Sequence, residues 1–260
     1  MRGELQVCAL ASGSSGNCFY VGNGKGGVLI DAGISAKQIC LRMAARGLQP
    51  ENVRGIFVTH EHSDHILGID VFARKFRVPV FTTRKTAAAC FLCEDAHLIR
   101  VIQNTEEVKL AGMTIEAFGK FHDAIDPVSY TISSVKKRVS VMTDLGHACK
   151  RVQEQISEAD FLFLESNHDE RMLRDGSYPE ELKQLILSDI GHLSNRQAGL
   201  CVLEYASQRL KHVVLSHLSE NNNTPQLALR TFMKLVKERS DLALNVGLSV
   251  REEATQVWAV

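Results

Sequence analysis

The chain has 260 residues, with 30 basic and 30 acidic side chains and no formal net charge. This length suffices for one large domain with a sizeable core, and the balanced charge excludes a protein that coats nucleic acid through bulk positive charge, although a local basic groove stays open. No apolar run approaches the roughly 18 residues that cross a bilayer, and the N-terminal segment lacks the apolar core of a signal peptide. We therefore expect a cytoplasmic protein with one domain over residues 1–260 and no membrane partner.

The predicted elements change in character along the chain. The first part favours strands over 5–12, 18–23 and 26–33, joined by glycine-containing turns. Helices over 34–47, 65–76 and 84–94 then alternate with strands over 53–60 and 78–83. Strand patterns dominate 97–145, and helices then alternate with the buried strands 160–166 and 212–219. This order predicts a layered α/β protein in which helices cover two sheets.

Seven cysteines are scattered along the chain, mostly in apolar contexts. In a cytoplasmic protein they are expected to be free and largely buried thiols. Cys90 and Cys93 have the spacing of a zinc knuckle, but the sequence has no second pair of this kind. We expect these two to share the buried face of the helix predicted over 84–94.

Six consecutive positions hold three histidines, a glutamate and an aspartate directly after a predicted buried strand. Burying such groups without partners is costly, so their clustering indicates ligands. His60 and His62 alternate along the extended chain and share one face, while Asp64 and His65 lie where the chain turns into a helix. Imidazole and carboxylate ligands without a nearby cysteine suit zinc, manganese or iron. A polar loop in which Ser63 or Asp64 caps the helix is the other interpretation, and it leaves the three histidines unexplained.

Three further residues of ligand type directly follow apolar strand patterns: His122, Asp144 and His217. Each alone is ambiguous, but four ligands in one loop can begin two metal sites and cannot complete them. We therefore expect further ligands at the ends of other strands.

The motif H-x-H-x-D-H at residues 60–65, with these later ligands, resembles the metallo-β-lactamase superfamily from about residue 10 to about residue 223. The resemblance implies an α/β fold, an αββα sandwich of two mixed sheets covered by helices, with two metal ions at one edge. It places Asp31 where it would orient a ligand. The implied ligands are His60, His62 and His122 for the first metal, and Asp64, His65 and His217 for the second, with Asp144 bridging both.

Later motifs resemble nucleases. G-H-x-S at 191–194 is similar to a segment of ribonuclease Z in which the histidine, here His192, acts in catalysis without binding a metal. The combination of "ASGSSGN", "THEHSDH", "ESNHD", "GHLSN" and "LSHLSENNN" most resembles the YycJ/WalJ-type exonucleases. This resemblance implies 5′→3′ hydrolysis of DNA by two divalent ions, zinc or manganese with iron also open, through a metal-bridging hydroxide. It makes Asp64, Asp144 and His192 catalytic and leaves the oligomeric state open.

Other polar side chains on the predicted edge are candidates for contacts with the substrate. His168 in "ESNHD" is a candidate extra ligand or phosphate contact, or the start of a helix. The loop at 13–17 offers Ser14, Ser15 and Asn17 to a phosphate, or is a bare turn between strands. Asn221 follows the last ligand, where it could contact nucleic acid or turn the chain.

Three other functions compete with the nuclease. A hydrolase of the same fold that cleaves a cyclic phosphodiester or a thioester would share every ligand position. A flavo-di-iron redox protein is disfavoured, because His62 stands where that branch has a glutamate and no flavodoxin-like domain follows. A binding module with a decayed site is disfavoured, because every expected ligand position is filled.

Overall fold

A computed structural model describes residues 4–260, which fall into two compact units. The first unit comprises Met1–Gly119, Ala124–Lys137 and Val250–Val260, and the second comprises Lys120–Asp123 and Arg138–Ser249. The first three residues, part of the segment considered for a signal peptide, lie outside the described residues. The single domain predicted over 1–260 stays a prediction.

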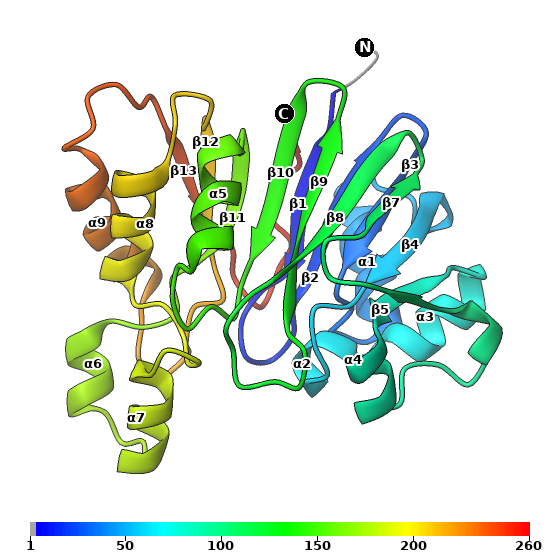
Figure 1. The fold of residues 1–260 in the computed structure, drawn as a ribbon, viewed down its shortest axis with the longest axis horizontal. Helices are drawn as coiled ribbons and strands as arrows, with labels where there is room; N and C mark the ends of the chain where they lie inside the picture. Colours follow the sequence, from blue (N-terminus) through cyan, green and yellow to red (C-terminus); the bar gives the residue numbers. More distant parts are fainter. Residues whose placement is uncertain (1–3) are drawn as a thin grey trace. The chain divides into compact units, whose positions relative to one another are not determined.

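A mixed sheet forms the centre of the first unit (Figure 1). Its strands pair antiparallel from β14 through β3 and parallel from β3 to β6. In sheet order they are β14 (Trp258–Ala259), β1 (Gln6–Ala11), β2 (Cys18–Asn23), β3 (Gly26–Ile30), β4 (Val53–Phe57), β5 (Val80–Thr83) and β6 (Ile99–Ile102). β3 and β4 are almost wholly buried, so the loop at the end of β4 is anchored to a rigid core.

Three antiparallel strands complete the β-structure described for this unit: β7 (Glu107–Leu110), β8 (Met113–Gly119) and β9 (Val128–Ser134). The helical segments are α1 (Ala36–Ala45), α2 (Ser63–Ile66), α3 (Ile69–Phe76), α4 (Arg84–Ala89), η1 (Pro50–Asn52) and η2 (Ala96–Leu98). Ser35 caps α1 by accepting a hydrogen bond from the Gln38 backbone nitrogen, and Ile39 and Met43 bury its apolar face.

Two helix predictions are wrong in extent. The helix predicted over 65–76 is two helices, because Gly68 separates α2 from α3 and its backbone nitrogen donates to the Ala32 carbonyl at 2.7 Å. The helix predicted over 84–94 ends at Ala89, so Cys90 and Cys93 do not share a helix face. There Leu92 and Cys93 join the buried core of the unit in irregular chain instead.

Parallel strands form the core of the second unit: β10 (Lys137–Met142), β11 (Phe161–Glu165), β12 (His212–Ser216) and β13 (Asn245–Leu248). Helices connect them, namely α5 (Lys150–Glu158), α6 (Glu170–Asp175), α7 (Glu180–Leu187), α8 (Asn195–Tyr205) and α9 (Pro225–Val236), and α8 packs beside α9 (Figure 1). The carboxyl ends of parallel neighbours meet at one sheet edge. The residues after β10, β11 and β12 are therefore brought together.

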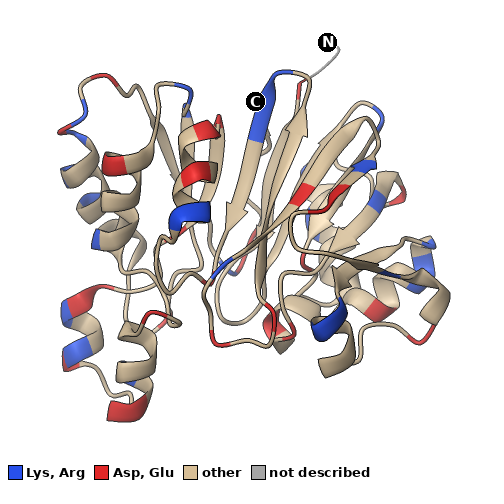
Figure 2. Ribbon diagram, in the orientation of Figure 1, with Lys and Arg blue, Asp and Glu red and all other residues tan. Residues whose placement is uncertain are grey.

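The charged residues are mixed in sign. Figure 2 shows both basic and acidic residues on α5 and on α6, and neither helix carries a purely basic stripe. Within residues 4–260, all seven cysteines are free thiols, and no helix has the length and apolar character needed to span a membrane.

Candidate functional site

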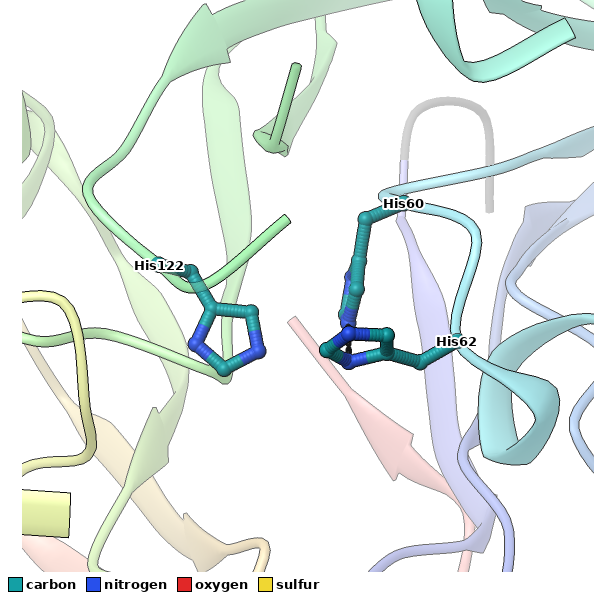
Figure 3. Close-up of side chains that lie close together, drawn as sticks. All are labelled: His60, His62 and His122. Carbon is teal, nitrogen blue, oxygen red and sulfur yellow. Dashed lines mark hydrogen bonds between the residues drawn. The ribbon is translucent and has the colours of Figure 1, made fainter. Parts of the chain in front are cut away.

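The loop after β4 brings His60 and His62 together in the first unit. His60 is fully buried, and its Nε2 lies 3.1 Å from His62 Nδ1. Figure 3 shows the two rings side by side. Two imidazole nitrogens bound tetrahedrally to one zinc ion at their usual bond lengths lie about 3.3 Å apart. The observed separation therefore suits two ligands of a single ion, as the alternation of His60 and His62 predicts.

His65 is held by a buried carboxylate. Its Nδ1 lies 2.7 Å from Asp31 Oδ2, and both side chains are fully buried. Asp31 is fixed in turn by the Thr59 backbone nitrogen and hydroxyl, each donating at 2.8 Å. A ring that donates from Nδ1 keeps Nε2 for a metal, and this nitrogen lies 3.4 Å from Asp64 Oδ2. Asp31 thus has the orienting position that the resemblance implies.

The loop at 13–17 supports these ligands. Asn17 is buried, its backbone nitrogen donates to the Asp64 carbonyl at 2.7 Å, and its Nδ2 lies 3.2 Å from Asp64 Oδ2. A Cβ on Gly33 would overlap the same Asp64 carbonyl oxygen, so this approach requires glycine. Asn17 is therefore placed to hold the ligand loop, whereas Ser14 and Ser15 are exposed.

The helix-capping interpretation of the loop finds no support in the structure. The residue that precedes α2 is His62, and its side chain makes no capping hydrogen bond. Glu61 points elsewhere, because its Oε1 accepts a hydrogen bond from the Ile125 backbone nitrogen at 2.7 Å. Glu61, which lies between two of the proposed ligands, thus anchors the loop.

In the second unit, four side chains converge: Asp144, Glu165 and His217 from strand ends, and His192 from the loop between α7 and α8. Each offers one ligand atom, and these atoms lie within 4.8 Å of one another. Asp144 Oδ1 is 3.4 Å from His217 Nδ1 and 4.0 Å from His192 Nδ1. Three of the four were predicted, and the fourth, Glu165, was not.

Glu165 is the centre of this cluster. Its Oε1 lies 2.7 Å from His217 Nδ1, 2.9 Å from His192 Nδ1 and 3.0 Å from the Asp144 backbone nitrogen. Its Oε2 accepts from the backbone nitrogens of Leu145 and Leu193 at 2.8 and 3.0 Å. Burial acts to raise the pKa of this carboxyl, but the charge of His192 and the hydrogen bonds outweigh it and hold the pKa below its ordinary range.

The signal that could have revealed Glu165 is the one that revealed Asp144. Glu165 ends the apolar strand pattern "DFLFL", where a charged side chain would otherwise be buried at a cost. Glu165 thus holds Nδ1 of both rings. The side chain of His192 is 20% exposed and that of His217 only 3%.

His122 lies beside this cluster. Its Nε2 is 3.8 Å from Asp144 Oδ1, and its Nδ1 faces the Gly191 carbonyl at 3.3 Å. Burial lowers the pKa of His122 to about 3, against the opposing effect of Asp144. The ring is therefore neutral near pH 7, the form in which histidine binds metals.

The remaining candidates, His168 and Asn221, differ in their surroundings. His168 is buried, neither of its ring nitrogens has a hydrogen-bond partner among the described residues, and burial lowers its pKa to about 4. Its ring is not part of the ligand groups found in residues 4–260. Asn221 Nδ2 donates to Tyr178 Oη at 3.0 Å on the surface.

Comparison with known proteins gives relatives over nearly the whole chain. The family model of the metallo-beta-lactamase superfamily matches residues 11–154. Exodeoxyribonuclease YycJ of Bacillus anthracis is 38% identical over 243 residues, which cover 90% of each chain. Exodeoxyribonuclease WalJ of Streptococcus pneumoniae serotype 2 is 38% identical over 249 residues, 93% of this chain and 91% of the relative.

Solved structures agree on the fold. The metallo-beta-lactamase fold protein YhfI from Bacillus subtilis has a TM-score of 0.72 at 13% identity and covers 99% of this chain and 100% of its own. A diphosphatase from the PhnP family has a TM-score of 0.68 at 17% identity, covering 99% and 98%. At these identities the likeness shows the fold alone, and it confirms the predicted α/β class. The chain belongs to the metallo-β-lactamase superfamily, as the H-x-H-x-D-H motif predicts.

Proposed function

We propose that this chain is a divalent-metal-dependent exonuclease that hydrolyses DNA from the 5′ end. The cluster of Asp144, Glu165, His192 and His217 carries the proposal, in a chain 38% identical over 90% of its length to an exodeoxyribonuclease. DNA as substrate rests on the names of the relatives, and the 5′→3′ polarity rests on the sequence resemblance. These names also favour a nuclease over the small-molecule hydrolase that the sequence left open. The cytoplasmic location stays a prediction of the sequence.

The donor set fits divalent metal ions. Two imidazoles, His65 and His217, each have Nδ1 held by a buried carboxylate, which is the usual support of a metal-binding histidine. Imidazole and carboxylate donors accept zinc, manganese or iron. When bound, two such ions activate a water molecule and neutralise charge on the phosphate. The proposed ligands are those predicted from the sequence: His60, His62, Asp64, His65, His122, Asp144 and His217.

His192 is the proposed general acid. Glu165 accepts a hydrogen bond from Nδ1 and fixes the ring, so Nε2 can give a proton to the oxygen that leaves phosphorus. Asp144 holds its place through its backbone nitrogen, which donates to the same Glu165 carboxylate. One carboxylate thus positions the acid and two proposed ligands together.

The proposed phosphate contacts are the exposed Ser14 and Ser15 hydroxyls and the His168 ring. The two serines support the role through their exposure in a loop that is anchored at Asn17. His168 supports it through two ring nitrogens that find no partner in the described protein. Asn17 and Asn221 are engaged elsewhere and are not proposed as contacts.

The test uses the full chain, stripped of metal and reloaded with Mn²⁺ or Zn²⁺. It is mixed with duplex DNA labelled at the 5′ or the 3′ end and with matched RNA, beside an Asp144→Ala control. We expect progressive shortening of DNA from the 5′ end that the control lacks. Intact nucleic acid together with turnover of a cyclic phosphodiester or a thioester would show that the substrate is wrong.

A further inference from the structure

We propose that Phe121 and His147 form a stacking platform for a nucleobase of the DNA substrate. The proposal rests on the proposed function and adds a binding subsite to it. Phe121 directly precedes the proposed ligand His122, and its side chain is 50% exposed. Its ring centroid lies 4.6 Å from that of His147, with the ring planes tilted by 35°. A partly exposed aromatic pair of this geometry offers a flat surface.

The pair is tied to the loops that carry the site. The Gly146 backbone nitrogen donates to the Phe121 carbonyl at 2.8 Å, so the backbone segments that carry the two rings are joined directly. His147 Nδ1 lies 3.0 Å from the Asp189 carbonyl, in the loop that leads to His192. A Cβ on Gly146 would overlap the same carbonyl oxygen, so these two loops approach as closely as glycine allows.

Three residues of the proposed site are close to Phe121 or His147 in the sequence, or belong to the loop that contacts His147. His122 is the next residue after Phe121, Asp144 is three residues before His147, and the loop that contacts His147 ends in His192. Neighbouring Cα atoms are about 3.8 Å apart. The backbone that carries the Phe121 ring is therefore directly joined to one of the three side chains at which a phosphodiester is proposed to bind.

The chemistry of the occupant can be inferred from this position. A single exposed phenylalanine needs no explanation, but this one is fixed, paired and adjacent to where a phosphate would bind. The flat aromatic faces of a DNA chain are those of its bases. Stacking of a base on an aromatic ring is tolerant of sequence, because every base has a π-face. The platform therefore predicts a nuclease that recognises an unpaired base without preferring one sequence.

The experiment compares two single-stranded DNA substrates that differ only at the 5′ nucleotide, which carries either a base or an abasic tetrahydrofuran. We expect the Mn²⁺-loaded full chain to prefer the base by about 5- to 150-fold in kcat/KM, the equivalent of about 1–3 kcal/mol. Phe121→Leu should reduce this ratio to near one, and Phe121→Trp should restore it. Phe91→Ala is the matched control, since Phe91 is 69% exposed outside these loops.

Two outcomes would overturn the platform: an unchanged ratio in Phe121→Leu, or an equal loss on both substrates. Binding gives a readout that does not need hydrolysis. A 5′ 2-aminopurine should be quenched on binding to Asp144→Ala, and less so when Phe121→Leu is added. If DNA is not hydrolysed but this quenching depends on Phe121, the proposed function fails and the platform stands. If the quenching does not depend on Phe121, the platform fails whatever the activity.

Discussion

Replacing Glu165 by glutamine removes one acceptor oxygen from the centre of the second unit. Glu165 is fully buried and accepts five hydrogen bonds, three on Oε1 and two on Oε2. In glutamine one of these oxygens becomes an NH₂ group, which cannot accept. Whichever way the amide turns, at least two N–H donors lose their acceptor.

The cost can be worked from this count. Each buried donor left unsatisfied costs about 1–3 kcal/mol, so Glu165→Gln should lower the free energy of unfolding by about 2–6 kcal/mol. Since small proteins have about 5–15 kcal/mol in total, the variant should still fold. In either orientation His217 loses its carboxylate partner and faces at best a neutral amide oxygen, so metal affinity should fall about 10- to 100-fold. Because His192 loses it as well, kcat should fall by about 10²–10⁴ even at saturating metal.

The measurements are urea unfolding of the metal-free protein, metal titration, and kcat on labelled DNA. Asp160→Asn is the matched control, because Asp160 is also buried in the second unit and accepts hydrogen bonds from Arg138 and Arg209. It should lower stability without changing metal affinity or kcat. A Glu165→Gln variant that binds metal as tightly as the wild type and turns over DNA normally would refute the reasoning.

Three other perturbations each probe a single feature of the site. His122 and His168 have pKa values of about 3 and 4, below the ordinary value of 6.5. Between these values the unfolded chain binds more protons than the folded one, so the free energy of unfolding should fall as the pH drops from 6.5 toward 4. Urea unfolding of the metal-free protein at pH 5 and pH 7 measures this, and equal stability at the two pH values would contradict it. Asp31→Asn should weaken binding of one metal about 10- to 100-fold by titration, while kcat at saturating metal stays close to that of the wild type. Gly33→Ala should lower the thermal midpoint, whereas Gly24→Ala, which meets only open space, should not.

The sequence predicted several of the proposed ligands because they follow strands. His60, Asp144 and His217 follow apolar patterns at positions where polar side chains would otherwise be costly, and this signal is local. The position of the break at Gly68 was not predictable in this way, since an apolar helical pattern runs across it and only the contact with the Ala32 carbonyl ends the helix. The helix end at Ala89 was missed for the same reason, because the residues beyond it are drawn into the core of the first unit.

Contacts between residues far apart in the sequence were beyond prediction. Glu165 orients His217, which lies 52 residues further along the chain, and the local sequence "FLFLES" does not indicate which residues Glu165 contacts. The pairing of Phe121 with His147 likewise depends on the hydrogen bond from the Gly146 backbone nitrogen to the Phe121 carbonyl. Without it, the sequence shows only isolated aromatic residues and no interleaved stripe of the kind that predicts a stacking platform.

Three non-glycine residues of the site adopt a backbone conformation that their residue types disfavour. Asp31, Asp144 and His217 have φ angles of 59°, 57° and 57°, in the left-handed region that favours glycine. Each follows a strand, β3, β10 or β12, at the point where the chain must leave the sheet. A non-glycine residue in this conformation costs about 1–2 kcal/mol, and it persists only where the surroundings and a needed side chain demand it.

The cost of this left-handed conformation can be measured by comparing the stability of glycine and alanine variants at the same position. At an ordinary position such as His122, whose φ is not among the positive values of the described residues, glycine should be less stable than alanine by roughly 0.5–1 kcal/mol. At Asp144 the order should reverse, so that Asp144→Gly is more stable than Asp144→Ala by about 1 kcal/mol although both are inactive. Urea unfolding of the four variants tests the reversal. Equal or greater stability of Asp144→Ala would mean that the left-handed backbone there carries no cost, and that Asp144 is kept for its carboxylate alone.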